Sequence, residues 1–274
     1  MGRIFEALQR SSGSKTSPES APEFAVIPEI VDNGSSDTID FTQIRSLPLA
    51  VDSEDRIVAL EEQRTLGTEK IRILAARLRH LQDQRTMKRI LVTSSVRGEG
   101  KTVLSTNLAV SLAKTKQRVL LIDGDAHQAN AGRILGVRGF AGLTDWWRSE
   151  EAIQSYLVRF NELQLWLLPA GSPIEQNVEM LQSRRLSAQL DRLSSSFDWM
   201  IIDSPPSAPL ADAAVWSRLA DAVLLVTREA TTPQRLLKKV LDSLDHSKVL
   251  GIVLNDCSDR DQRYYAQYYN LQRQ

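Results

Sequence analysis

Apolar runs and helical patterns alternate along the chain from about residue 89 to residue 256. Runs with strand character, several of them continuously apolar, lie at residues 89–95, 118–125, 163–171, 198–206, 220–227 and 248–256. Patterns with a helical period lie between them, at residues 101–114, 183–196 and 233–244. Continuously apolar strands separated by helices are typical of a parallel sheet that helices cover on both faces. The pattern therefore predicts an α/β domain with a mostly parallel sheet, whose ligands bind at the carboxyl ends of the strands.

Two helical patterns come before this alternation, at residues 53–66 and 68–85, and Gly67 is the expected break between them. The second helix has an apolar stripe on one face, formed by Ile71, Leu74, Leu78 and Leu81. The other face carries charges, for which solvation is the simplest role.

The first 53 residues have a different composition. Residues 11 to about 53 are rich in Ser, Pro, Glu and Asp, and such a segment buries too little apolar surface to offset its ordering entropy. We expect a flexible linker there. Before it, Ile4, Phe5 and Leu8 lie on one helical face. This pattern fits either a frayed terminus or a helix that docks on another protein.

Charge and composition limit the classes of partner that the chain can bind. The chain has 274 residues and a formal net charge of zero, so no global field attracts it to nucleic acid or to anionic lipid. Cys257 is its only cysteine, which excludes an intramolecular disulfide. It has no apolar run of 18 residues, so we expect no direct membrane insertion and attribute any membrane association to a partner.

The segment SSVRGEGKT (94–102) lies between a predicted strand and a predicted helix. Backbone N–H groups of such a loop converge on phosphate oxygens, and the helix N-terminus adds a favourable dipole. The pattern G-x-x-x-x-G-K-[ST] is met except at its first position, where Ser95 replaces glycine. The sequence therefore predicts a nucleotide-phosphate site formed by Gly98, Glu99, Gly100, Lys101, Thr102 and Val103.

Acidic residues end two of the predicted strands. RVLLIDGD ends in Asp123 and Asp125, and DWMIIDSPP contains Asp203. Helix capping would be the ordinary role of one such aspartate, but three beside a phosphate loop indicate a catalytic centre. Mg²⁺ prefers oxygen ligands, and Thr102, Asp123 and Asp203 are the candidates to hold it. Asp123 or Asp125 would position the attacking group, with Lys101 as the catalytic cation.

The C-terminal residues 259–274 contain four of the five tyrosines of the chain. They are Tyr264, Tyr265, Tyr268 and Tyr269. They fit either an aromatic helix that packs on another surface or a phosphorylatable cluster, in which each modification adds up to about two negative charges.

With these motifs together, the chain resembles the bacterial tyrosine kinases of capsule and exopolysaccharide synthesis, from residue 54 to residue 270. These kinases belong to the P-loop family that includes the MinD and ParA ATPases. SSVRGEGKT is similar to the variant Walker A motif of that family, VLLIDGD to its Walker A′ motif and WMIIDSPP to its Walker B motif. The resemblance implies a kinase domain over residues 54–258 and a tyrosine tail over residues 259–274.

The resemblance also implies functional roles. Lys101 and Thr102 bind ATP and Mg²⁺, and Asn255 hydrogen-bonds the base. The four tail tyrosines accept phosphate from a neighbouring subunit. Glu69 and Arg72 help to close a ring of subunits, although Ala75 stands where a second arginine is usual.

The implied partner is a membrane protein, on a separate polypeptide, that regulates polymer chain length and activates the kinase. The resemblance places the chain in the cytoplasm, peripheral to the inner membrane through that partner.

Two other functions stay open at this point. The first is a switch ATPase of the MinD or ParA kind, although Val96 stands where those proteins carry a signature lysine. The second is an ATP-binding regulatory subunit that has lost transfer chemistry, because AHQAN (126–130) replaces the usual Leu-Arg and proline after Walker A′. His127, in that segment, fits either a solvated loop histidine or a contact to the nucleotide or a tyrosine.

Overall fold

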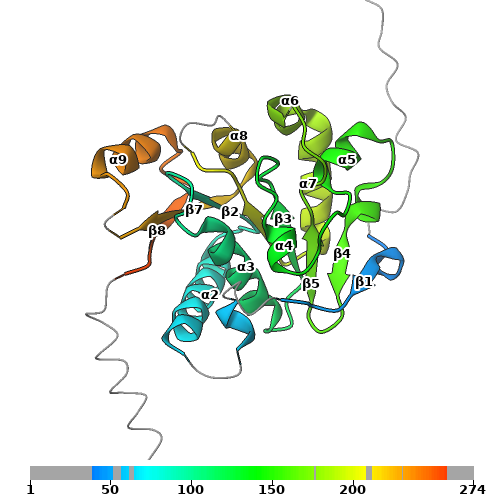
Figure 1. Cartoon of the computed structure of the whole chain (residues 1–274), viewed down its shortest axis with the longest axis horizontal. Helices are drawn as coiled ribbons and strands as arrows, with labels where there is room; N and C mark the ends of the chain where they lie inside the picture. Colours follow the sequence, from blue (N-terminus) through cyan, green and yellow to red (C-terminus); the bar gives the residue numbers. More distant parts are fainter. Residues whose placement is uncertain are drawn as a thin grey trace, which may run out of the picture. The chain divides into compact units, whose positions relative to one another are not determined.

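The computed structural model describes residues 39–51, 57–61, 65–175, 177–207, 212–229 and 231–257. In these residues one sheet has eight strands in the order β1-β4-β5-β3-β6-β2-β7-β8 (Figure 1). The strands are β1 (Arg45–Leu47), β2 (Arg89–Ser94), β3 (Val119–Asp123), β4 (Val158–Phe160), β5 (Leu165–Leu168), β6 (Trp199–Asp203), β7 (Ala222–Arg228) and β8 (Val249–Asn255). All neighbouring pairs are parallel except β4 and β5. The prediction of a mostly parallel sheet is confirmed.

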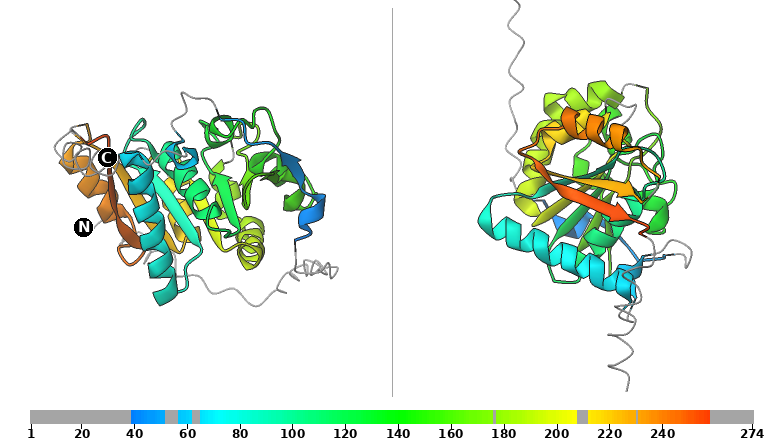
Figure 2. Two further views of the ribbon diagram at one scale, coloured as in Figure 1. Left: turned by 90° about the horizontal axis from the view of Figure 1, so that it is seen from below. Right: turned by 90° about the vertical axis from the view of Figure 1, so that its left-hand side faces the viewer.

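Helices cover both faces of the sheet. They are α2 (Leu66–Gln84), α3 (Lys101–Ala113), α4 (Ala131–Ile134), α5 (Leu143–Arg148), α6 (Asn177–Gln182), α7 (Arg184–Ser196), α8 (Asp212–Leu219) and α9 (Gln234–Ser243), with short 3₁₀ turns η1 (Phe41–Gln43), η3 (Val58–Leu60) and η4 (Ile153–Tyr156). Helices α2 and α3 lie on one side of the sheet, and α7, α8 and α9 lie on the other (Figures 1 and 2).

The strand pattern divides the apolar side chains between two cores. On β2, Ile90 and Val92 pack in the core beneath α2 and α3, whereas Leu91 packs in the opposite core. On β3, Leu121 and Leu120 divide in the same way. Because successive strand residues point to opposite faces, a strand buried on both faces must be apolar throughout.

The helical prediction for residues 53–66 is wrong. Among the described residues of that segment, Val58–Leu60 form the 3₁₀ turn η3, Glu61 after it has a non-helical ψ of 135°, and Leu66 already begins α2. Gly67 does not end a helix either, because it lies in the first turn of α2, after an N-cap at Thr65 whose side chain accepts a hydrogen bond from the Thr68 N–H. A glycine this close to the helix start costs little helical stability, so it does not interrupt the helix.

Part of the segment expected to be a linker is folded. Residues 39–51 include η1 and β1, and β1 pairs in parallel with β4. Ile39 and Ile44 are buried, and the Phe41 ring packs on Trp166 and Phe197 with centroid separations of 5.0 and 5.6 Å. A few apolar residues therefore hold this stretch on the sheet despite its polar composition.

The predicted docking helix at residues 1–10 and the tyrosine tail at residues 259–274 lie outside the described residues. Among the helices that the structure describes, none is both long and apolar enough to cross a bilayer.

Candidate nucleotide and phosphotransfer site

The loop between β2 and α3 has the backbone geometry of a phosphate cradle. Gly98 and Gly100 adopt positive φ values of 83° and 94°. Gly100 is also the N-cap of α3 and has no side chain to cap the helix. The first backbone hydrogen bond of the helix is donated by the Leu104 N–H to the Gly100 carbonyl, at 2.9 Å. The backbone N–H groups that precede Leu104 in the first turn have no acceptor within the helix. They can therefore donate to an anion at the positive end of the helix.

Side chains from outside the loop hold it in place. The buried Glu99 carboxylate accepts a hydrogen bond from the Val96 N–H at 2.8 Å, and its other oxygen bonds Thr232. The Asn255 amide, at the end of β8, donates to the Glu99 carbonyl at 3.0 Å. Glu99 therefore fixes the loop with its carboxylate and leaves only its backbone to a ligand. Contact between Asn255 and the base stays a prediction.

Lys101 and Asp125 form a buried ion pair at the start of α3. The Lys101 ammonium lies 2.9 Å from the Asp125 carboxylate, and both residues are buried. The same ammonium lies 3.5 Å from the Thr102 hydroxyl. The residues predicted to bind phosphate and to form the acidic centre thus meet across the carboxyl ends of β2 and β3. A buried cation with one carboxylate partner can exchange that partner for phosphate oxygens.

Asp123 and Asp203 lie opposite each other in the register of β3 and β6, and both are buried. Burial raises the pKa of Asp123 to about 8, and the negative charge of Asp203 adds to the shift. Burial also raises the pKa of Asp203 to about 6, against the opposing charge of Lys101. Within the described residues, neither carboxylate oxygen of Asp203 has a partner in hydrogen-bond geometry, although the nearby Thr102 and Ser105 hydroxyls oppose the rise of its pKa. The pair favours a proton or a cation between its members.

Gly124 lets these two strand ends approach each other. Its N–H donates to the Asp203 carbonyl at 2.7 Å. A Cβ at this position would lie 2.9 Å from that carbonyl oxygen and 2.9 Å from the Trp216 ring. The ring is itself fixed, because its indole N–H donates to the Gly124 carbonyl. The glycine between Asp123 and Asp125 is therefore a steric requirement of the site.

We expect Gly124→Ala to lower the free energy of unfolding by about 1–3 kcal/mol, because neither the backbone nor the buried ring can move freely. The melting temperature should fall by several degrees. Gly251→Ala is the matched control, since a Cβ at Gly251 meets nothing within 4 Å. Equal melting temperatures for the two variants would contradict the steric role.

Comparison with known proteins identifies the family. The AAA domain family model matches residues 87–250. The tyrosine-protein kinase CpsD of Streptococcus pneumoniae serotype 4 is 34% identical over 175 residues, which are 62% of this chain and 76% of that protein. The chain belongs to the bacterial tyrosine kinases. It is also 29% identical over 184 residues to the succinoglycan biosynthesis transport protein ExoP of Rhizobium meliloti, covering 65% of this chain and 23% of that protein.

Solved structures agree with this family. The BceF tyrosine kinase domain superposes with a TM-score of 0.66 and 26% identity, covering 78% of this chain and 83% of that one. The septum site-determining protein MinD of Pyrococcus horikoshii, complexed with Mg-ADP, superposes with a TM-score of 0.52 and 26% identity, covering 64% and 73%. The kinase therefore has a P-loop fold that a nucleotide-binding relative shares.

The residues of the kinase site fit a magnesium ion only with help from a ligand. No group of three or more His, Cys, Asp or Glu side chains is placed to hold a metal in the described ranges. Among the described residues, both buried carboxylate oxygens of Asp203 lack a partner in hydrogen-bond geometry, and the Thr102 hydroxyl belongs to the first turn of α3. Mg²⁺ usually keeps several waters and takes phosphate oxygens beside one or two protein ligands. This donor set suits such a site.

The structure adds a contact that the sequence did not reveal. The His127 imidazole Nε2 lies 3.1 Å from the Asp212 carboxylate, to which the Asn177 amide donates at 2.7 Å. Asp212 is buried, whereas the His127 side chain is 42% exposed. The loop after Asp125 is thereby fixed to the starts of α8 and α6. An aspartate at a helix start was a visible signal, but its partners are 85 and 35 residues away.

The remaining predicted residues lie away from this centre or outside the described chain. Glu69 and Arg72 lie on α2 and pair with each other at 2.9 Å. The four tail tyrosines are not among the described residues. Cys257 is exposed just after β8.

Proposed function

We propose that this kinase is an ATP-dependent protein tyrosine autokinase. The proposal rests on the buried Lys101–Asp125 pair, which joins the end of the phosphate loop to the strand end that follows Asp123, and on the Asp123–Asp203 pair beside it in the sheet. Phosphoryl transfer requires positioning and charge neutralisation more than covalent chemistry, and these residues supply both. The family membership indicates tyrosine as the acceptor.

Each side chain has a role in this proposal. The first turn of α3 binds phosphate oxygens through its backbone N–H groups, and Lys101 exchanges Asp125 for the outer phosphate. Mg²⁺, when bound, neutralises phosphate charge, and Thr102, Asp123 and Asp203 are the side chains that would hold it. Asp125, once released from Lys101, accepts or orients the proton of the attacking tyrosine hydroxyl. Asp123 is the alternative base.

The proposed acceptors are Tyr264, Tyr265, Tyr268 and Tyr269, phosphorylated between chains. We propose that phosphorylation adds mutually repelling charges that release subunits from a homo-oligomer. Glu69 and Arg72 are the proposed subunit contacts, and the Arg72 side chain is 54% exposed while paired with Glu69, which leaves it accessible to a second subunit.

Transfer between chains can be tested by mixing two variants. The donor carries Tyr→Phe at all four tail positions, and the acceptor carries Lys101→Met. With [γ-³²P]ATP, each variant alone should stay unlabelled on the tail, and the mixture should label the tail of the acceptor. If wild-type protein is labelled but the mixture is not, transfer occurs within one chain.

The proposed biological setting is the synthesis and export of capsule or exopolysaccharide. ExoP, which aligns with this chain over part of its length, is named for succinoglycan biosynthesis transport. We propose that a membrane regulator on a separate polypeptide activates the kinase and brings it to the cytoplasmic side of the inner membrane.

A switch ATPase is the second candidate, because the fold is also that of MinD in complex with Mg-ADP. Val96 stands where such proteins carry a signature lysine, which favours the kinase. The two functions differ in the fate of the γ-phosphate: the kinase transfers it to tyrosine, whereas the ATPase releases it to water.

A further inference from the structure

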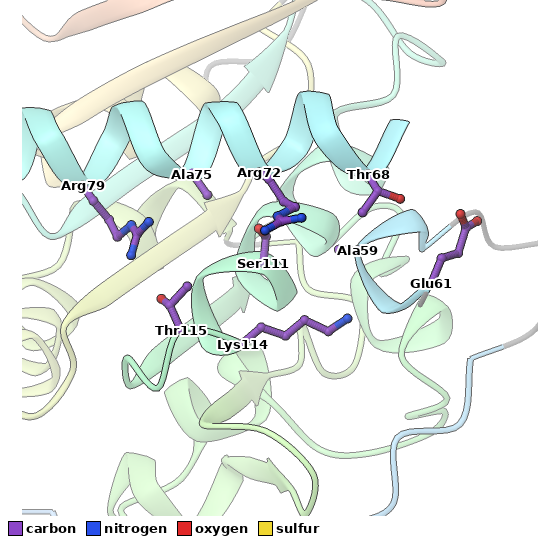
Figure 3. A pocket seen from close by; sticks show the side chains of 9 residues that line it. All are labelled: Ala59, Glu61, Thr68, Arg72, Ala75, Arg79, Ser111, Lys114 and Thr115. Atoms are coloured by element: carbon purple, nitrogen blue, oxygen red, sulfur yellow. The ribbon is translucent and has the colours of Figure 1, made fainter. Parts of the chain in front are cut away.

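A pocket lies away from the nucleotide site, between α2 and the C-terminal end of α3. Its volume is about 340 Å³. Arg72 and Arg79 enter from α2, and Ser111, Lys114 and Thr115 come from the end of α3 and the residues after it (Figure 3). The lining contains three cations and one carboxylate, that of Glu61 at its edge.

Two of the three cations have no partner of opposite charge in the described part of the chain. Arg79 and Lys114 form no ion pair with any residue that the structure describes, whereas Arg72 pairs with Glu69. The Arg79 Nε is buried and has no hydrogen-bond acceptor within the same residues. A buried donor without an acceptor costs about 1–3 kcal/mol. An anionic ligand would remove that cost.

The helix spacing aims both guanidinium groups at the same opening. Arg72, Ala75 and Arg79 are three and four residues apart, so they share one face of α2. The small Ala75 side chain leaves the space between the two arginines open. Across the pocket from α2, the Lys114 side chain extends along the floor towards Ala59 and Glu61, and Ser111 lies beside Arg72 (Figure 3).

We propose that this pocket binds a phosphate monoester. Planar guanidinium groups present paired N–H donors that match phosphate oxygens. The positive charges of the two arginines and of Lys114 would together balance the two negative charges of the phosphate group. The volume leaves room for the esterified group beside the phosphate. The site has no glycine cradle, and it faces the negative end of α3, so affinity must come from its side chains.

Two sources can supply this chemistry. One is a free small phosphate ester, and the other is a phosphotyrosine side chain of another copy, which would couple the pocket to the product of the kinase. The second source rests on the proposed function, whereas binding of a supplied ester does not, so the two ideas can fail separately.

The test uses the full-length, dephosphorylated chain with its nucleotide site filled by Mg-ADP. Phenyl phosphate and a phosphotyrosine peptide with the tail sequence DQRYYAQYYNLQ are titrated separately by calorimetry. We expect saturable binding of at least one of them, weakened at least about 10-fold in the double variant Arg79→Gln, Lys114→Gln, because each lost charge-assisted bond weakens binding by about that factor or more. The ligand that binds more tightly identifies the source.

Lys70→Gln with Arg77→Gln is the matched control. These residues are exposed on the same helix, are not in the pocket lining, and their replacement removes the same charge. We expect the control to change affinity by less than about twofold, because exposed charges outside the site contribute little. Absence of saturable binding for both ligands, or an equal loss in the two double variants, would overturn the proposal.

Discussion

Replacement of Lys101 by methionine will reduce the transfer of phosphate from ATP to tyrosine by at least about 100-fold. Removal of one preorganised charge that stabilises a transition state usually costs that much in rate. Lys101 is the cation that the structure places at the start of α3, within 2.9 Å of the acidic centre. The measurement is the initial rate of tyrosine labelling with [γ-³²P]ATP.

Two further variants separate chemistry from folding. Lys101→Met leaves Asp125 buried without its cation, and loss of one partner of a buried pair can destabilise a protein by about 3–5 kcal/mol. The double variant Lys101→Met, Asp125→Asn removes both charges and should recover most of that stability without recovering transfer. Lys239→Met, at an exposed position on α9, should leave the rate unchanged. A Lys101→Met protein that folds and labels tyrosine at the normal rate would contradict the assigned role.

The Asp123→Asn variant should be more stable than the wild-type chain at pH 8 when nucleotide and metal are absent. Burial raises the pKa of Asp123 from the ordinary aspartate value of 3.8 to about 8, so the folded state holds a proton that the unfolded state has lost. The contribution of this carboxyl to stability is therefore greatest below pH 4 and falls as the pH rises towards 8. Each pKa unit corresponds to about 1.4 kcal/mol. Asparagine does not ionise, so it avoids this loss of stability. We expect the free energy of unfolding at pH 8 to rise by about a few kcal/mol.

The stability difference between Asp123→Asn and the wild-type chain should shrink as the pH falls from 8 towards 5. Chemical denaturation of both proteins in EDTA at several pH values in this range measures the difference. Asparagine keeps an oxygen that can accept the Ala131 N–H, which donates to Asp123 at 3.0 Å. The control, Asp242→Asn, changes an exposed carboxyl on α9 and should give a small, pH-independent difference. A variant that is less stable than wild type at every pH would show that the buried carboxyl is not destabilising. The same substitution should abolish phosphate transfer if Asp123 belongs to the catalytic centre, as we propose.

The sequence predicted the central sheet well, and it predicted that the polar residues at the strand ends lie close together, for a physical reason. Strands β2, β3 and β6 are buried on both faces, so they read as continuous apolar runs, and each ends at a loop whose polar residues stand out against the run. The predictions of Lys101, Asp125 and Asp203 as neighbours followed from the shared edge of a parallel sheet.

Other features depend on contacts that a local pattern does not contain. Strand β1 has three residues, two of them polar, and exists because β4 accepts it as a neighbour. The His127–Asp212 contact joins residues 85 positions apart. The pocket between α2 and α3 arises where two helices face each other, so its arginines looked like an ordinary solvated face in the sequence. Gly67 misled the helix prediction because glycine is a reliable stop only where φ must be positive.

Transfer to tyrosine and release to water are the two possible fates of the γ-phosphate, and both can be measured in the wild-type protein. Purified full-length chain is incubated with Mg²⁺ and [γ-³²P]ATP, and the phosphate bound to protein and the phosphate released to water are quantified together. Mass spectrometry then locates the label. We expect label on one or more of Tyr264, Tyr265, Tyr268 and Tyr269. Sustained release of phosphate with no tyrosine label would contradict this expectation and identify a switch ATPase.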